Sequence, residues 1–236
     1  MVQQRPLKTL ERVLSKAGVG SRVEARGWIA AGRVQVNGAV VRDPDQWVDL
    51  ELDRVAFDGQ PLVARERVYL LLHKPAGYLT TYRDRDGRPT VYDLIADVGT
   101  FLSPVGRLDL ATSGLLLMTN DNAFAERVTN PASHVPKTYR VEASVPLTDE
   151  QLERLRMGIE LSDGPTRPAE VARTGDSSFE ITLTEGRNRQ VRRMVEALDA
   201  RVLTLVRVRI GGIAIGDLPI GTWRMLTPAE AGALRG

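Results

Sequence analysis

The segment GRLDLATSGLLLMTND, residues 106–121, places reactive side chains beside an apolar run. An ionised Asp109 can act as a general base or as a nucleophile, and Arg107 lies two residues before it. The run Leu115–Met118 follows shortly afterwards and predicts a buried strand. Burial next to such a strand disfavours the charged form of a carboxyl group, so Asp109 needs a cation close by to stay ionised.

Cations are concentrated in two separate parts of the chain. Residues 1–42 hold eight Lys and Arg against two Glu, and residues 186–209 hold seven Arg against Glu196 and Asp199. Residues 43–66 reverse the balance, with seven acids against two Arg, and the net charge of the whole chain is +2. The two basic blocks indicate a polyanion bound at two places, although solvated helix faces would give the same composition.

The composition excludes several classes of site. The chain of 236 residues contains no Cys, which rules out disulfides, thiolate metal sites and a cysteine nucleophile. His73 and His134 are far apart and have no acid at ligand spacing, so we expect no metal site. No Gly-rich phosphate loop, signal peptide or long apolar segment is present. We therefore predict a cytoplasmic protein that is not bound to a membrane.

The first 42 residues predict two helices and a hairpin. Apolar residues from Leu7 to Leu14 have helical spacing up to Gly18, and Ser21 with Glu24 forms a capping-box pattern for a second helix that ends at Gly32. Residues 33–41 predict a strand, an Asn-Gly turn and a strand. Residues 7–38, above all AGVGSR and GRVQVNG, resemble the S4 RNA-binding domain.

The S4 resemblance implies that the second helix and its basic loop bind structured RNA. Arg22 and Arg26 share one helical face at four-residue spacing and could reach adjacent phosphates. The RNA-binding residues that we predict in this domain are Lys16, Arg22, Arg26 and Arg33.

The rest of the chain predicts an α+β domain with a mixed, mainly antiparallel sheet flanked by helices. The stretch 60–66 has the composition of a linker. The predicted strands are 68–72, 115–119, 137–144, 179–183 and 202–210, and the predicted helices are 149–157, capped by Thr148, and 189–198. The domain boundaries that we predict are 5–60 for the S4 domain, 61–67 for the linker and 68–236 for the second domain.

The second domain resembles the pseudouridine synthases. The segment GRLD followed by TSGLLL looks like their catalytic loop, and further motifs follow in the family order. These are HKPAG with GRPTV at 73–77 and 87–91, KTYRV at 137–141, EGRNRQVRRM at 185–194 and LVRVRIG at 205–211. With the S4 domain, they point to the ribosomal-RNA branch that contains RsuA, RluB, RluE and RluF. Within this branch, DGRPTVYD and LTEGRNR resemble the RluB type.

The resemblance implies a role for each site residue. Asp109 is the catalytic carboxylate, Arg192 pairs with it, and Tyr139 stacks on the uracil. Leu205 closes the base pocket, although core packing would explain it nearly as well, and Arg107 enters the RNA stack where the uridine has left. Arg187, Arg189 and Arg193 are assigned to phosphates.

The implied reaction needs no cofactor, because uracil is released from the ribose and rejoined to it through carbon. The carboxylate either attacks C1′ or removes the C2′ proton, and the sequence leaves both routes open. A hydrolytic glycosidase would normally need two carboxylates, and no second acid lies in a comparable motif.

The function that we predict is conversion of uridine to pseudouridine in ribosomal RNA, in the 23S rather than the 16S RNA. The partner is ribosomal RNA or a pre-ribosomal particle, and the enzyme is expected to be a monomer. A non-catalytic RNA-binding or ribosome-assembly protein on the same fold is the alternative from a different class. It has little use for a carboxylate directed at RNA phosphates, which would repel that charge.

Overall fold

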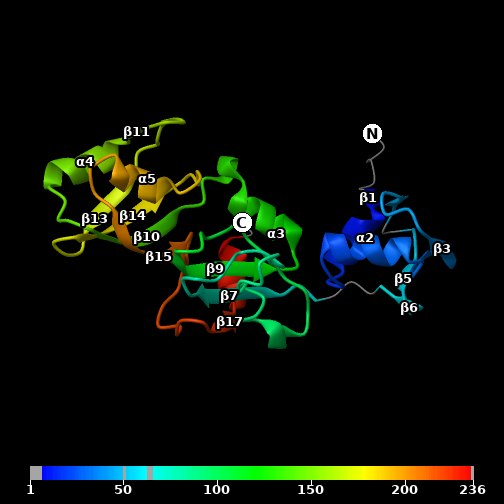
Figure 1. Ribbon diagram of the computed structural model, residues 1–236. Helices are drawn as coiled ribbons and strands as arrows, with labels where there is room; N and C mark the ends of the chain where they lie inside the picture. The colour runs from blue at the N-terminus through cyan, green and yellow to red at the C-terminus, as the bar shows by residue number, and fades with distance from the viewer. Residues whose placement is uncertain (1–6, 50–51, 63–65, 235–236) are drawn as a thin grey trace. The chain divides into compact units, whose positions relative to one another are not determined.

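The computed structural model describes residues 7–49, 52–62 and 66–234. The chain forms two compact units (Figure 1). The first extends to Val68 and includes Asp97–Ser103 and Asn120–Asn122, and the second contains the remaining residues. Residues 5–6, 50–51, 63–65 and 235–236, which belong to the predicted domains and linker, lie outside the described residues.

The first unit consists of two helices and short strands, as expected for an S4 domain. Its elements are β1 (Lys8–Thr9), α1 (Leu10–Lys16), α2 (Arg22–Ala30), β2 (Val34–Val36), β3 (Ala39–Val41), β4 (Trp47–Val48), β5 (Val55–Phe57) and β6 (Gln60–Pro61). The helices and the sheet share one apolar core that includes Leu10, Leu14, Ile29 and Val34.

Local sequence signals form this unit as predicted. Ser21 and Glu24 make the capping box of α2, with the Glu24 amide 3.3 Å from the Ser21 hydroxyl oxygen. Asn37 and Gly38 both have positive φ, which is the conformation that a tight Asn-Gly hairpin turn requires. The first helix starts at Leu10 rather than Leu7, because Lys8 and Thr9 pair with β4.

The linker begins after Pro61 in the structure, later than the start at residue 61 that the sequence predicts. Gln60 and Pro61 form β6, which pairs with β5 through Ala56 and Phe57. Composition alone misses this strand because its register depends on a neighbouring strand.

The second unit is built on a nine-stranded sheet of order β13-β14-β10-β15-β9-β7-β17, with β16 beside β15 and β8 beside β9. The strands are β7 (Tyr69–Lys74), β8 (Ser103–Pro104), β9 (Ser113–Thr119), β10 (Lys137–Ala143), β13 (Glu170–Arg173), β14 (Ser178–Leu183), β15 (Val202–Ile210), β16 (Ile213–Ala214) and β17 (Trp223–Met225). The helices and the small hairpin are α3 (Asn122–Thr129), α4 (Asp149–Met157), α5 (Gln190–Glu196), α6 (Pro228–Ala233), the 3-10 turns η1 (Ala96–Val98) and η2 (Pro131–Ser133), and β11 (Glu160–Leu161) with β12 (Gly164–Pro165).

This sheet is mixed and mainly antiparallel, which confirms the predicted fold class. The strands predicted at 202–210 and the helix predicted at 149–157 have the observed bounds. α3 and α6 were not predicted; α3 buries only Phe124 and Val128, and α6 only Ala231, so their apolar spacing is weak.

The sheet has two halves that meet where β15 pairs with β9 in parallel. One half packs α4 and α5 against β10, β13 and β14 in a core that includes Phe179, Leu152 and Met194. The other half packs α3 and α6 against β7 and β9 around Leu117 and Phe124. Figure 1 shows α4 and α5 beside one half of the sheet and α3 beside the other. Residues brought to the parallel junction therefore come from both halves.

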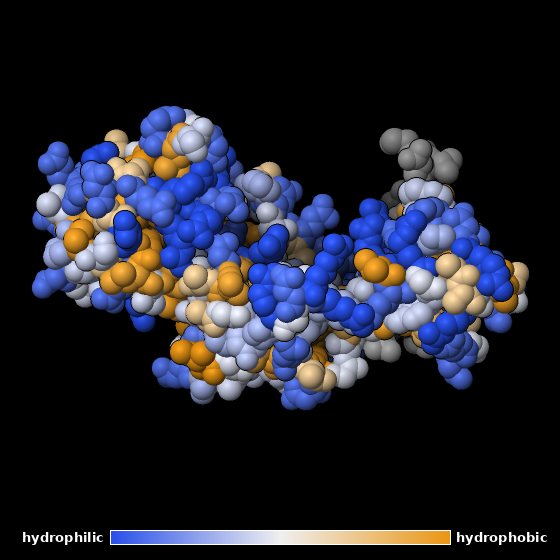
Figure 2. All heavy atoms as spheres, viewed as in Figure 1, coloured by the Kyte–Doolittle hydropathy of each residue, from blue (hydrophilic) through white to orange (hydrophobic). Residues whose placement is uncertain are grey.

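On the face of the molecule in Figure 2, apolar side chains are dispersed. Figure 2 shows hydrophobic residues in small separate groups on the face in view, with hydrophilic residues gathered beside α5. None of the helices in the described ranges is long and apolar enough to span a membrane.

Gly114 is required at the parallel junction. Its φ is +109°, and a Cβ added there would lie 2.5 Å from the backbone nitrogen of Arg207. We expect Gly114→Ala to lower the unfolding free energy by about 2 kcal/mol or more, since both the backbone conformation and the close approach exclude a side chain. Chemical denaturation measures the change. Gly212→Ala is the matched control, because Gly212 has no neighbour within 4 Å of an added Cβ. Equal stability of the two variants would contradict the close approach.

Candidate active site

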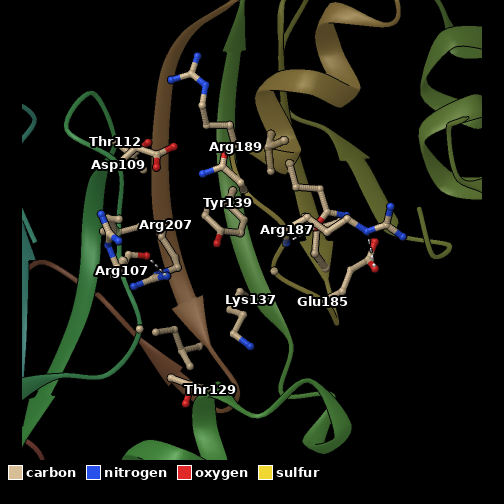
Figure 3. A pocket seen from close by; sticks show the side chains of 18 of the residues that line it. Arg107, Asp109, Thr112, Thr129, Lys137, Tyr139, Glu185, Arg187, Arg189 and Arg207 are labelled. Atoms are coloured by element: carbon tan, nitrogen blue, oxygen red, sulfur yellow. Dashed lines mark hydrogen bonds and ion pairs between the residues drawn. The ribbon is translucent and has the colours of Figure 1, made fainter. Parts of the chain in front are cut away.

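A cavity of about 440 Å³ opens at the junction of the two half-sheets, a size typical of ligand pockets. Six of the predicted site residues line it: Arg107, Asp109, Tyr139, Arg187, Arg189 and Leu205. Figure 3 shows Asp109 and Arg107 on one side of the cavity, Tyr139 between, and Arg187 with Glu185 on the other side. Segments that are far apart in the sequence thus meet around one half-buried carboxylate.

Asp109 lies on a tightly held loop between β8 and β9. The Thr80 hydroxyl donates to the carbonyl of Leu108 at 2.9 Å, and the Gly77 amide donates to the carbonyl of Leu110 at 2.7 Å. Within the loop, the Thr112 amide donates to the carbonyl of Asp109 at 3.0 Å. The main chain on both sides of the carboxylate is therefore fixed by hydrogen bonds.

Lys74 holds this loop from beneath. Its side chain is fully buried, and Nζ donates to the carbonyl oxygens of Pro75, Asp109 and Thr112 at 3.0, 3.2 and 2.8 Å. Burial lowers the pKa of Lys74 from 10.5 to about 8, against the opposing charge of Asp109. Lys74 lies in the HKPAG motif, which by itself predicts no role for it, but a lysine at the end of an apolar strand is a sequence signal for a buried cation.

Arg192 approaches the loop in a different way from the one predicted. No ion pair joins Arg192 to Asp109 within 4.0 Å in the described structure. The guanidinium instead donates to the carbonyls of Ala111 at 3.0 Å and Val202 at 3.2 Å. Burial, followed by the charge of Arg189, lowers the pKa of Arg192, while Asp109 acts in the opposite direction. Both terminal nitrogens of the guanidinium are thus bonded to main-chain oxygens. Arg192 and Asp109 interact through their charges and form no ion pair.

Tyr139 and Leu205 form the wall of the cavity that the sequence assigned to the base. Tyr139 is half-buried on β10, and Leu205 is buried on β15. Leu205 also belongs to the core of the half-sheet that contains α5. It therefore both lines the cavity and packs in the core, the two alternatives that the sequence left open.

The predicted phosphate-binding arginines fall into two groups. Arg107 and Arg189 are exposed, and within the described chain their guanidinium groups have no hydrogen-bond or ion-pair partner. Arg187 donates to the carbonyl of Gly164 at 2.8 Å and to Glu185. Arg193 pairs with Asp163 at 2.7 Å and does not line the cavity. The first group is therefore available to an anion, whereas the second is already engaged.

The predicted RNA-binding arginines of the first unit are paired with acids. Arg22 and Arg26 share a face, as expected, and both reach the buried carboxylate of Glu11, at 2.7 and 3.1 Å. Hydrogen bonding from Arg22 lowers the pKa of Glu11 against the effect of burial. Arg33 pairs with Asp58 and stacks on Phe57 at 4.7 Å. Lys16 is half-buried at the end of α1. The arginines remain partly exposed, so their planar groups are held in place at the surface.

The described residues contain no cluster of His, Asp and Glu that could hold a metal ion. His73 Nδ1 lies 2.7 Å from the carbonyl of Leu218, and His134 lies beside Arg167.

Both units match models of known protein families. A family model for RNA pseudouridylate synthase matches residues 68–197, and an S4 domain model matches residues 9–52. An uncharacterized RNA pseudouridine synthase of Aquifex aeolicus is 40% identical over 95% of this chain and 92% of its own length. The ribosomal large subunit pseudouridine synthases B of Bacillus subtilis and Escherichia coli K12 are 37% and 38% identical, covering 97% and 96% of this chain and 96% and 81% of their own lengths.

A solved structure shows the same similarity. A crystal structure of a pseudouridylate synthase superposes with a TM-score of 0.70 at 31% identity, covering 96% of this chain and 99% of that one.

The buried ammonium of Lys74 predicts a specific dependence of stability on pH. Between pH 8 and 10.5 the unfolded chain holds a proton that the folded chain has released, so the unfolding free energy should rise with pH in this window. Lys74→Met cannot titrate at this position. We therefore expect the unfolding free energy of the wild type, minus that of Lys74→Met, to increase from about pH 8 upward. Chemical denaturation at several pH values measures it. A difference that stays constant would contradict the lowered pKa of Lys74.

Proposed function

The chain belongs to the RNA pseudouridylate synthase family, and we propose that it converts uridine to pseudouridine in RNA of the large ribosomal subunit with Asp109 as the catalytic carboxylate. The large-subunit target is supported by relatives that carry this name and cover nearly the whole chain. The observation that carries the proposal for the site is that Asp109, Tyr139 and Arg107 line one cavity of about 440 Å³.

The reaction needs a carboxylate at the ribose of an everted uridine. Asp109 either attacks C1′ while the bond from C1′ to N1 breaks, or removes the C2′ proton to give a glycal. The released uracil turns against Tyr139, and C5 bonds to C1′ while the ester bond from Asp109 to C1′ breaks or, on the glycal route, while C2′ takes its proton back from Asp109. The C5 proton then leaves and N1 gains a proton. Atoms and charge balance without a second reactant, which fits an isomerisation that uses one acid.

The surrounding residues take supporting roles in this proposal. Tyr139 and Leu205 hold the uracil, Arg107 occupies the space that the uridine leaves, and Arg189 binds a phosphate. Arg192 stabilises the charge of Asp109 from a distance through the field of its guanidinium. Arg187 and Arg193 can bind phosphates only if the phosphates displace Glu185 and Gly164 from Arg187 and Asp163 from Arg193.

The first unit supplies RNA affinity through Lys16, Arg22, Arg26 and Arg33. We also propose that the protein acts as a monomer in the cytoplasm, with an S4 domain that extends through β6 to Pro61 and a catalytic domain that begins with β7. Deletion of residues 1–64 should weaken RNA binding and reduce its dependence on salt, because fewer phosphates are neutralised.

Replacement of the carboxylate tests the catalytic role. We expect Asp109→Asn to lower the single-turnover rate on ribosomal RNA by at least about a hundredfold, since general-base or nucleophilic action is lost. The RNA dissociation constant should stay within about twofold. Asp176→Asn, in an exposed turn of the same unit, is the control and should leave the rate unchanged. A variant at Asp109 that still turns over would remove the proposed mechanism.

Pseudouridine mapping in cells tests the target. Ribosomal RNA from cells with and without the gene should differ at one or a few positions of the large-subunit RNA. Loss in the small-subunit RNA would move the target to that subunit. An unchanged map in both RNAs would favour a non-catalytic binding protein.

A further inference from the structure

Arg207 occupies the central position at the junction of the two half-sheets. It pairs with Gly114 of β9 in the parallel register and with Tyr139 of β10 in the antiparallel register. Residues directly opposite each other across two strands place their side chains on the same face of the sheet. Arg207 therefore lies between the strand that carries Tyr139 and the strand that follows the Asp109 loop, and its side chain lines the cavity.

The guanidinium of Arg207 joins the two ends of the catalytic loop. Its Nε donates to the carbonyl of Leu115 at 2.8 Å, and Nη1 lies 3.5 Å from the carbonyl of Arg107. Figure 3 shows this side chain extending from its strand toward Arg107, below Asp109. One planar group thus spans the segment 107–115, which carries the carboxylate of Asp109. Two separate bonds from one rigid fork fix both spacing and orientation.

Gly114 makes this arrangement possible. Because a Cβ at Gly114 would collide with the backbone of Arg207, the two strands approach each other more closely here than a side chain would allow. The close approach brings the root of the Arg207 side chain next to the end of the loop. The guanidinium can therefore turn back along the loop and reach its first residue.

Packing alone does not explain why a charged residue occupies position 207. The residue is 4% exposed, and no carboxylate forms an ion pair with it among the described residues. Its Nη2 is buried and has no hydrogen-bond partner. A buried cation with an unused donor costs free energy that an apolar residue would avoid. Arg207 also acts with burial to lower the pKa of Lys74 and of Lys137 at the cavity, so its field reaches the site.

We propose that Arg207 is a positioning residue that holds the Asp109 loop at a fixed distance from Tyr139, so that the carboxylate meets the ribose while the base stacks on the ring. This inference rests on the proposed function. It assigns to Arg207 a role in the rate of the chemical step and none in RNA affinity. Misplacement of a reacting group by about 1 Å can cost about a hundredfold in rate.

Arg207→Lys tests the proposal, because lysine keeps the charge but cannot bond both carbonyls with a planar fork. We expect the single-turnover rate to fall by about ten- to a hundredfold, with the RNA dissociation constant within about twofold of wild type. Arg140→Lys is the matched control: Arg140 lies next to Tyr139 on β10, its side chain is 62% exposed, and it pairs with Glu180. This control should keep the wild-type rate.

Hydrogen exchange separates positioning from general stability. In Arg207→Lys we expect faster exchange of amides in segment 107–115, with unchanged exchange in α4 and β14. A variant that keeps the full rate, loses rate only in proportion to RNA affinity, or exchanges faster throughout the unit would overturn the role. If Asp109→Asn is inactive and Arg207→Lys is fully active, this inference fails alone. If Asp109→Asn is active, the proposed mechanism itself fails.

Discussion

Three buried cations determine how the structure presents Asp109. Lys74 comes from β7, Arg192 from α5 and Arg207 from β15, and each donates to main-chain carbonyls in or beside the loop that carries the carboxylate. None of the three forms an ion pair in the described part of the chain, so peptide dipoles compensate their charges, and the charge of Asp109 adds to this for Lys74 and Arg192. Buried charge is costly without such compensation, which ties the positions of these cations to the loop.

This constraint explains why the site lies where two half-sheets meet. The loop belongs to the half that contains α3 and α6, whereas Arg192, Arg207, Tyr139 and Leu205 belong to the half that contains α5. The parallel pairing of β15 with β9 at Gly114 is the shared element. A change at this junction therefore alters the geometry of the cavity even when it touches no lining residue. The exposed guanidinium groups of Arg107 and Arg189 then add positive charge at the mouth, where a phosphate backbone would arrive.

Local signals in the sequence were sufficient for much of the fold. The capping box at Ser21, the Asn37-Gly38 turn and the helix capped by Thr148 depend on neighbours within a few residues, and each formed as predicted. The motifs also identified Asp109, Tyr139 and Leu205, which line one cavity in the structure. The partners of the arginines could not be predicted in this way. Arg26 pairs with Asp45 and Arg33 with Asp58, and Arg192 bonds to Ala111 instead of Asp109, because these contacts depend on how distant elements pack.

The proposed mechanism requires that the cavity receives an everted uridine with its ribose at residue 109. A crystal structure of Asp109→Asn bound to a fragment of its RNA substrate tests that claim most directly. We expect the target base to lie against Tyr139, its C1′ and C2′ to lie beside the side chain at 109, and Arg107 to fill the space left in the RNA. A target base that remains stacked in the RNA, with the cavity facing away from it, would contradict the account.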